Sequence, residues 1–279
     1  MKTSLDDVRT LLFWKAVFAE FLGTFILVVV GIGSTVQGWT ADPLDIVQIA
    51  LSFGLGVATS VWIIGHISGG HINPAVTCAM LITRRVSLIR AILFIVAQSI
   101  GSIAGAGILK ALTPDFQIGG LGTTTLNTGV TIAQGFGIEL VITMVLILTV
   151  FAACDSKRTD LGGSFPLTIG FAVTIGHLWA VEYTGSSMNP ARSLGPAVIM
   201  DIWTDHWIYW VGPITGGLLG GLLYDNLLAS NASLRKARDL LMASHFDDGK
   251  YPEQKPNIRV IDTEQGEKGD GEVLISNSF

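Results

Sequence analysis

The chain has 279 residues, of which 49% are hydrophobic and only 14% are charged. Soluble domains average about 25% charged residues, so this composition excludes an ordinary soluble protein and indicates a membrane protein. The net charge of −5 says little by itself, because 16 of the 39 charged side chains lie in residues 230–279. The charge distribution therefore divides the chain into a membrane body and a polar tail.

Six apolar runs approach the roughly 20 residues that a helix needs to cross about 30 Å of hydrocarbon. In chain order they are residues 13–36, 44–65, 88–109, 131–153, 166–183 and 207–229. Two shorter apolar stretches, 73–83 and 189–200, would reach only about halfway across at ~1.5 Å per residue. We predict a segment 1–12, a channel domain 13–229 with repeats at about 13–109 and 131–229, and a tail 230–279.

Lys and Arg side chains gather on one side of the predicted spans. The loops and ends on that side carry Lys2, Arg9, Lys15, Arg84, Arg85, Lys157, Arg158, Arg235, Lys236 and Arg238. The opposite loops hold only Lys110 and Arg192. Because positive residues mark the cytoplasmic side, both termini are predicted to be cytoplasmic. We expect an integral membrane protein of the plasma membrane.

Each short stretch begins with the same three residues, Asn73-Pro74-Ala75 and Asn189-Pro190-Ala191. Asn is a strong helix N-cap, and Pro is favoured at the first helical position. Each box therefore predicts the start of a short helix. With the predicted orientation, one box lies on the cytoplasmic side and the other on the outer side. We expect the two half-helices to enter the membrane from opposite faces.

The two halves of the chain share further residues. Glu20-x-x-x-Thr24 matches Glu139-x-x-x-Thr143, at 53 and 50 residues before the two boxes. Three spans per half is an odd number, so the second half must be inverted relative to the first. Inverted halves with broken helices that meet at the midplane are typical of a transport pathway. Irregular backbone at that depth is tolerated only against protein or a water-filled cavity.

These motifs resemble the aquaporin, or major intrinsic protein, family over about residues 10–230. The resemblance implies an all-α membrane fold of six transmembrane helices plus two half-helices in two inverted repeats. It implies a passive water channel that excludes protons and ions, and a homotetramer with one pore per subunit. An enzyme is not expected, because no metal cluster, nucleophile pair or phosphate loop is present. No cofactor, metal or nucleic-acid partner is expected.

Physical reasoning supports a water site at the boxes. Helix N-termini carry partial positive charge, which repels cations. Asn73 and Asn189 can cap their helices and still direct amide hydrogens into the pore. A passing water would turn its oxygen toward both amides, which interrupts a proton-conducting chain.

The resemblance also implies a narrow filter, at Phe53, His177, Ser186 and Arg192. Arg192 is otherwise hard to explain, because a cation near a helix start is disfavoured. Glycerol-conducting relatives usually have Asp after this Arg, where the chain has Ser193. The positions that resemble the water-selective branch are Thr113, Ser193, Ala197, Tyr209 and Trp210. Taken alone, Tyr209 and Trp210 are each better explained as aromatics of the membrane interface.

Glu20 and Glu139 are expected to brace the loops before the boxes, because a buried carboxylate needs hydrogen-bond donors. The alternative is a relay in a proton-coupled transporter. His66 is equally well explained by pore lining and by loop anchoring. Gly-rich ridges, Gly212, Gly216, Gly217, Gly220 and Gly221 together with Gly101 and Gly105, are predicted to pack the two halves together.

Regulatory features are fewer. Arg84-Arg85-Val86-Ser87 fits a basophilic-kinase pattern, but a helix N-cap explains Ser87 better. In the tail, Leu234, Ala237 and Leu241 share one helical face, which predicts a short helix on the cytoplasmic surface, with a calmodulin-type site as the alternative. The chain from about Asp247 is predicted to be disordered.

Three function classes remain open in the sequence. The first is a water-selective channel, which the filter residues favour. The second is a channel of the same fold for glycerol, peroxide or ammonia. The third is a junctional or adhesion protein that keeps the fold and conducts poorly.

Overall fold

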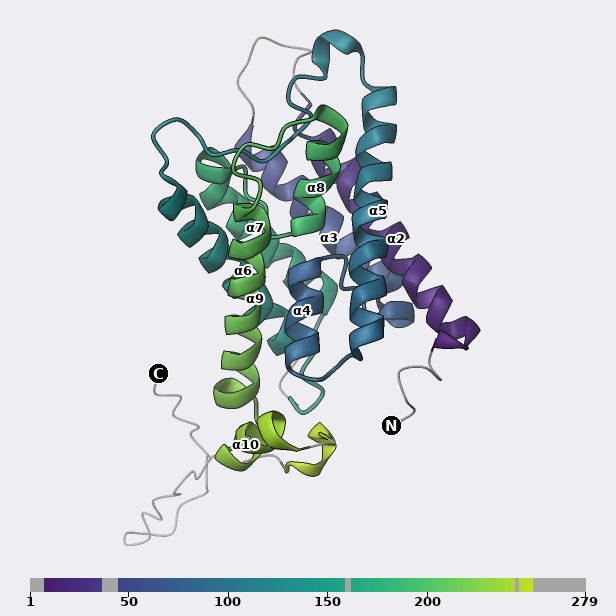
Figure 1. Ribbon diagram of the computed structural model, residues 1–279, viewed down its shortest axis with the longest axis vertical. Helices are drawn as coiled ribbons and strands as arrows, with labels where there is room; N and C mark the ends of the chain where they lie inside the picture. The colour runs from purple at the N-terminus through teal and green to yellow at the C-terminus, as the bar shows by residue number, and fades with distance from the viewer. Residues whose placement is uncertain (1–7, 37–44, 159–161, 244–245, 253–279) are drawn as a thin grey trace, which may run out of the picture.

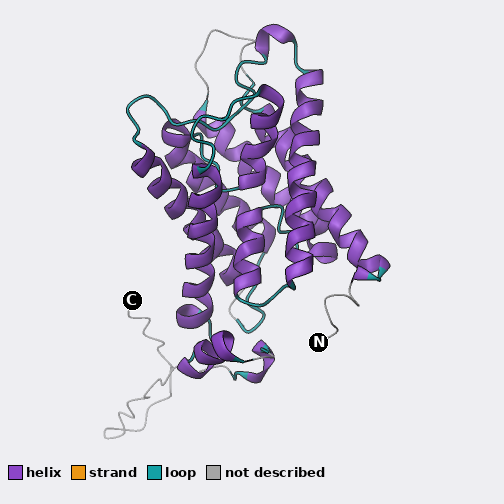
Figure 2. Ribbon diagram, viewed as in Figure 1, coloured by secondary structure: helices purple, strands orange, loops and turns teal. Residues whose placement is uncertain are grey.

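The computed structural model describes residues 8–36, 45–158, 162–243 and 246–252 (Figure 1). Figure 2 shows that all regular structure in these ranges is helical. Six long helices form the body of the described chain. They are α2 (Leu11–Gly33), α3 (Ile46–Ser68), α5 (Leu88–Leu112), α6 (Ile132–Ala153), α7 (Phe165–Thr184) and α9 (Ile208–Leu223). Each coincides with a predicted apolar run, so the all-α fold class is confirmed.

Five of these helices are long and apolar enough, by length and composition, to cross a membrane. The sixth, α9, has only 16 residues by itself. It passes directly into a π-helical turn, η2 (Tyr224–Leu228), which completes the predicted run of 207–229. In the described ranges, the membrane-spanning body thus consists of six helices, of which the last is α9 continued by η2.

Two short helices, α4 (Pro74–Ile82) and α8 (Pro190–Met200), begin directly after the Asn of each box. The side-chain oxygen of Asn73 accepts a hydrogen bond from the N–H of Ala75 at 2.8 Å. Asn189 caps α8 in the same way through Ala191 at 3.0 Å. In Figure 1, α4 lies in the lower half of the bundle and α8 in the upper half. The half-helices therefore enter from opposite ends.

The two halves of the chain interlock through these half-helices. The half-helix α4 packs against α9 of the second half, and α8 packs against α5 of the first half. The long helices α3 and α7 form a further contact between the halves. Within each half, α2 packs on α5 and α6 packs on α9. Each half-helix thus packs against a long helix of the other half, as expected for an inverted repeat with half-helices.

The prediction that the glycine ridges join the two halves is wrong for most of these glycines. A Cβ on Gly216 would collide with the carbonyl oxygen of Leu140 in α6, and one on Gly101 with that of Phe21 in α2. Both are contacts within one half; Gly105, Gly212 and Gly220 likewise face their own half. Gly217 and Gly221 instead face α4. Helix α9 therefore has two glycine faces, one against α6 of its own half and one against α4 of the other half. Small residues on both faces let the neighbouring backbones approach closely.

The short tail helix forms, but its predicted packed face is wrong. Helix α10 (Leu234–Met242) lies at the lower end of the bundle in Figure 1. Leu234 and Leu241 are 92% and 75% exposed, whereas Lys236 and Leu240 are buried. The polar contacts of Lys236, rather than apolar periodicity, orient this helix.

Lys236 is buried because carboxylates from two directions surround its ammonium group. Its Nζ lies 3.1 Å from Asp225 Oδ1 in η2 and 2.8 Å from Asp248 Oδ1. Lys157 Nζ donates to the carbonyl oxygens of Asp248 and Tyr251, at 2.9 and 3.0 Å. The prediction of disorder from about Asp247 is therefore wrong for residues 247–252, which carry η3 (Asp248–Lys250). Residues 253–279 lie outside the described residues.

Candidate functional site

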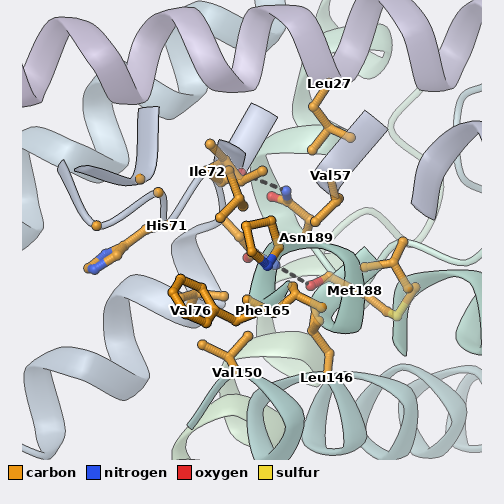
Figure 3. A pocket seen from close by; sticks show the side chains of 18 of the residues that line it. Leu27, Val57, His71, Ile72, Val76, Leu146, Val150, Phe165, Met188 and Asn189 are labelled. Atoms are coloured by element: carbon orange, nitrogen blue, oxygen red, sulfur yellow. Dashed lines mark hydrogen bonds between the residues drawn. The ribbon is translucent and has the colours of Figure 1, made fainter. Parts of the chain in front are cut away.

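The capping asparagines of the two boxes also join the two half-helices. Asn73 Nδ2 donates to the carbonyl oxygen of Met188, and Asn189 Nδ2 donates to that of Ile72, both at 2.8 Å. Figure 3 shows both bonds as dashed lines, with Asn189 directed toward Ile72. A side-chain amide has two hydrogens, so each asparagine retains one donor beyond this bond. Both residues line a common cavity.

In Ile72 and Met188, which precede the boxes, both the backbone N–H and the backbone carbonyl form hydrogen bonds to side chains. Their φ angles are 45° and 50°, in the left-handed region that strains a β-branched residue such as Ile72. Glu20 Oε2 accepts from the N–H of Ile72 at 2.7 Å, and Glu139 Oε2 from that of Met188 at 2.9 Å. Each N–H is thus bound by a glutamate of its own half, and each carbonyl by an asparagine of the other half.

The second oxygen of each glutamate accepts one backbone N–H and one hydroxyl. These donors are the His71 N–H and Ser68 hydroxyl for Glu20, and the Ser187 N–H and Thr184 hydroxyl for Glu139, all at 2.6–2.9 Å. Both glutamates are fully buried. Donors of this kind stabilise a buried carboxylate and tie it to the loop. The geometry supports loop bracing over a proton relay.

Three of the four expected filter residues meet at one level. The rings of Phe53 in α3 and His177 in α7 stack with centroids 4.4 Å apart. The guanidinium carbon of Arg192 in α8 lies 4.7 Å from the centroid of Phe53. Arg192 Nη1 donates to the carbonyl oxygen of Gly122 at 2.6 Å. His177 and Arg192 thus share Phe53 as a neighbour, although they come from different helices.

Two polar atoms at this level, His177 Nε2 and Arg192 Nε, are buried without a hydrogen-bond partner in the described residues. Ser186 Oγ, in the loop before the second box, is buried without a partner as well. His177 Nδ1 lies 3.0 Å from the carbonyl oxygen of Val173, which orients the ring and leaves Nε2 to bind another molecule. Buried polar groups normally have a partner, so such a cluster indicates a place where a polar permeant is bound.

A cavity of about 620 Å³ extends from this level past both asparagines toward the α10 end of the bundle. Arg192, Phe53 and His177 border it, and Ser187 rather than Ser186 lines it. Figure 3 shows Leu27, Val57, Leu146 and Val150 around the cavity, so its wall is mostly apolar. Its opposite end is bordered by His66, Trp62, Cys154 and Phe165. His66 therefore lines the cavity, one of its two predicted roles.

The positions expected to separate water channels from glycerol channels do not form one cluster. Thr113 is the C-cap of α5 and bonds to the carbonyl oxygen of Leu109 at 2.7 Å. Ala197 is fully buried in α8. Trp210 Nε1 donates to His206 Nε2 at 3.2 Å. Only Ser193 touches the loop before the second box, through Ser187 Oγ at 2.7 Å.

The interpretation of Tyr209 as an interface aromatic is wrong. Its side chain is fully buried, and its hydroxyl donates to the carbonyl oxygen of Thr184 at 2.9 Å. Thr184 ends α7 and bonds to Glu139, so Tyr209 supports the brace of the second loop. Tyr209 and Trp210 are adjacent aromatics, so the sequence gives both the same interpretation. Of the two, Trp210 is partly exposed and Tyr209 is buried.

Ser87 is the N-cap of α5, as favoured, and accepts from the N–H of Arg90 at 3.3 Å. Arg84 donates to the carbonyl oxygen of Ala243, and Arg85 pairs with Asp225 at 2.8 Å. The arginines of the kinase-like pattern thus contact the tail and η2.

Sequence reasoning missed two residues near the filter, Gly122 and Thr124. Both lie in the loop between the halves, and Thr124 Oγ1 donates to Ser193 Oγ at 2.8 Å. Neither belongs to a repeated motif, so no signal in one sequence could have found them. In the described residues no three His, Cys, Asp or Glu side chains gather as a metal site.

Comparisons with known proteins agree with this geometry. The family model "Major intrinsic protein" matches residues 7–224. Aquaporin-4 of Mus musculus is 49% identical over 98% of this chain and 92% of its own length. The lens fiber major intrinsic protein of Lithobates pipiens is 50% identical over 80% of this chain and 84% of its own. An aquaglyceroporin structure from Plasmodium falciparum superposes with a TM-score of 0.72 at 24% identity, over 77% of this chain and 97% of that one.

Proposed function

This chain belongs to the major intrinsic protein family and is a membrane channel for water, and we propose that its selectivity resides in two consecutive places. The first is the pair of asparagines at the tips of the half-helices. The second is the filter of Phe53, His177, Ser186 and Arg192. The permeant is water and the setting is the lipid bilayer.

The observation that carries this proposal is the set of unpartnered polar atoms at the filter. His177 Nε2 can accept a hydrogen bond, and Arg192 Nε can donate one, in a wall otherwise formed by Phe53. A water molecule that enters loses hydrogen bonds to bulk water, and these groups replace them. A solute with a carbon backbone has fewer polar groups for its size, so the same contacts replace less of its lost hydration. The filter thus favours a single small, polar permeant.

The asparagines supply the second part of the mechanism. One amide hydrogen of Asn73 is bound by Met188, and one of Asn189 by Ile72, which orients the remaining two. These hydrogens and the N-terminal ends of α4 and α8 all present positive charge to the permeant. A water oxygen that accepts from both amides points its own hydrogens away from the pair. Proton hopping is interrupted there, and cations are repelled.

Two other uses of the fold are less well supported. A channel for glycerol is not favoured at a filter where three bulky side chains, Phe53, His177 and Arg192, lie together. A poorly conducting junctional protein needs an obstructed path, whereas one cavity joins the filter, both asparagines and the end bordered by Trp62 and Phe165. Water conduction is the use that the site supports best.

Stopped-flow shrinkage of proteoliposomes tests the proposal. Water and glycerol permeability should be measured on one preparation, with empty liposomes as the reference. We expect water permeability well above the reference and glycerol permeability close to it. Water permeability equal to that of empty liposomes would contradict the channel function, and comparable glycerol uptake would contradict the selectivity.

The biological setting remains part of the proposal. The loops at the α10 end carry Arg and Lys side chains, which supports cytoplasmic termini. The exposed apolar side chains of the long helices are suited to contact with lipid and with other subunits, so the proposal includes a homotetramer in the plasma membrane. A kinase at Ser87 or a calmodulin-type partner at α10 is a weaker proposal. The exposed Leu234, Leu241 and Met242 offer an apolar face to such a partner. Binding of labelled tail peptide to calmodulin, and phosphorylation of purified protein, would test these two.

A further inference from the structure

A chain of buried hydroxyl groups holds the loop before the second box. Thr124 Oγ1 donates to Ser193 Oγ at 2.8 Å, and Ser193 Oγ donates to Ser187 Oγ at 2.7 Å. Ser187 Oγ in turn donates to the carbonyl oxygen of Asn189 at 3.1 Å. The hydroxyl residues are at most 2% exposed. Each hydroxyl donates once, so the chain has one direction, from the connecting loop to the second box.

In the second half, the pair Ser187 and Ser193 binds a third residue, Thr124. The first half contains the corresponding pair, but a different residue binds it. His71 and Thr77 lie two residues before and four residues after Asn73, as Ser187 and Ser193 do around Asn189. His71 Nδ1 lies 3.1 Å from Thr77 Oγ1, so the pair is in contact in this half too.

The third member comes from different kinds of structure in the two halves. In the first half it is Gln98 of the long helix α5, whose Nε2 donates to Thr77 Oγ1 at 3.0 Å and to Glu20 at 2.8 Å. In the second half it is Thr124, which belongs to the loop between α5 and α6. This loop therefore takes the place that a membrane helix has in the first half.

The same loop holds two consecutive residues of α8. The carbonyl oxygen of Gly122 accepts from Arg192, and two residues later Thr124 donates to Ser193. The loop also packs against the end of α7, because a Cβ on Gly185, the C-cap of α7, would lie 3.2 Å from Thr124 Cα. Gly185 directly precedes Ser186 of the filter. Thr124 thus contacts two of the chain segments that carry filter residues, the start of α8 and the loop that contains Ser186, although it does not line the cavity.

We propose that Thr124 is a positioning residue for the filter, which acts through Ser193 and Ser187 to set the place of the Arg192 guanidinium. Loss of its hydroxyl frees the loop to shift, which widens the opening toward solutes larger than water. The proposal rests on the proposed function, because it assigns a role within that filter. It predicts a change in selectivity rather than in water conduction alone.

The test is the ratio of glycerol to water permeability in proteoliposomes of Thr124→Val, which keeps the side-chain shape without the hydroxyl. We expect the ratio to rise roughly fivefold, the population change that loss of one buried hydrogen bond allows. Thr124→Ser keeps the hydroxyl and should restore the wild-type ratio. Thr125→Val changes the exposed neighbour and serves as the matched control.

A double-mutant comparison identifies the route. Ser193→Ala should raise the ratio, and adding Thr124→Val should raise it no further, because both remove the same link. If Thr124→Val does not assemble, Ser193→Ala alone still tests the link, and an unchanged ratio there overturns the proposal. A wild-type ratio in Thr124→Val, or a raised ratio in Thr124→Ser, also overturns it. Absence of water conduction in the wild type would instead contradict the proposed function.

Discussion

The side-chain amide of Asn189 donates a hydrogen bond to the backbone carbonyl of Ile72, 117 residues away in the chain. The equivalent bond of Asn73 reaches Met188. Each half-helix is therefore fastened to the loop that leads to the other one. The proposed water site at the centre and the joint between the two halves involve the same two side chains.

Replacing either asparagine with aspartate should keep the N-cap of the half-helix but remove the hydrogen bond that the side chain donates to the other half. Aspartate caps a helix as well as asparagine does, but it cannot donate to the opposite carbonyl. We expect Asn73→Asp and Asn189→Asp each to destabilise the protein by about 1–3 kcal/mol, because two buried acceptors then face each other. Thermal unfolding in detergent measures this. A marked difference between the two variants would contradict the equivalence of the two bonds.

Replacing Arg192 with valine should weaken selectivity. The guanidinium lies over Phe53 and is held by Gly122, so its loss widens the filter and removes a positive charge. We expect the glycerol-to-water permeability ratio to rise roughly tenfold, which corresponds to about 1.4 kcal/mol of barrier. Proton leak into liposomes with a pH-sensitive dye should rise as well. Unchanged values of both would remove Arg192 from the filter.

Mercurial compounds should not block the wild-type pore through the filter, because Ser186 has no thiol. Because Ser186 belongs to the proposed filter, Ser186→Cys should create a mercurial-sensitive channel whose block is reversed by excess thiol. Cys154 is exposed and borders the far end of the cavity, away from the filter. Rapid block of the wild type that Cys154→Ser abolishes would show that the reactive thiol lies there instead.

Docking of the tail should be insensitive to pH in the physiological range and should weaken in acid. Partial burial alone would raise the pKa of the Asp248 carboxyl, but hydrogen bonds from Lys236 and Asn231 and the nearby charges hold it at about 2, below the usual 3.8. A lowered pKa in the docked state stabilises docking above pH 3.8, and this contribution is lost as pH falls toward 2.

Hydrogen exchange of residues 233–252 measures this docking. Protection should be constant from pH 7 to about pH 5 after correction for intrinsic rates, and should fall below about pH 4. Lys236→Met should abolish the protection at neutral pH, because it leaves Asp225 and Asp248 without their shared cation. Lys250→Met changes an exposed lysine nearby and should retain it. Full protection in Lys236→Met would contradict the role of the buried lysine.

Much of the channel body could be predicted from the sequence because its signals are local. Apolar runs of membrane length, and Asn-Pro at the start of a helix, depend on neighbouring residues alone. Two matching halves with an odd number of spans then require inversion. The errors arose where side chains meet partners distant in the chain. Taken alone, Tyr209 is better explained as an interface aromatic, yet it bonds to Thr184. Disorder is predicted from about Asp247, yet Lys157 and Lys236 bind residues 248–251.

The sequence by itself determined the helices, the two capped half-helices and the inverted order, since each follows from short-range pattern and membrane thickness. Only the tertiary structure decided which donor meets which acceptor. The carbonyl groups of Ile72 and Met188 are bound by asparagines of the opposite half, and Thr124 reaches Ser193 from a connecting loop. Such pairs depend on how the halves interlock, because a backbone carbonyl or a loop hydroxyl carries no sequence signal of its own.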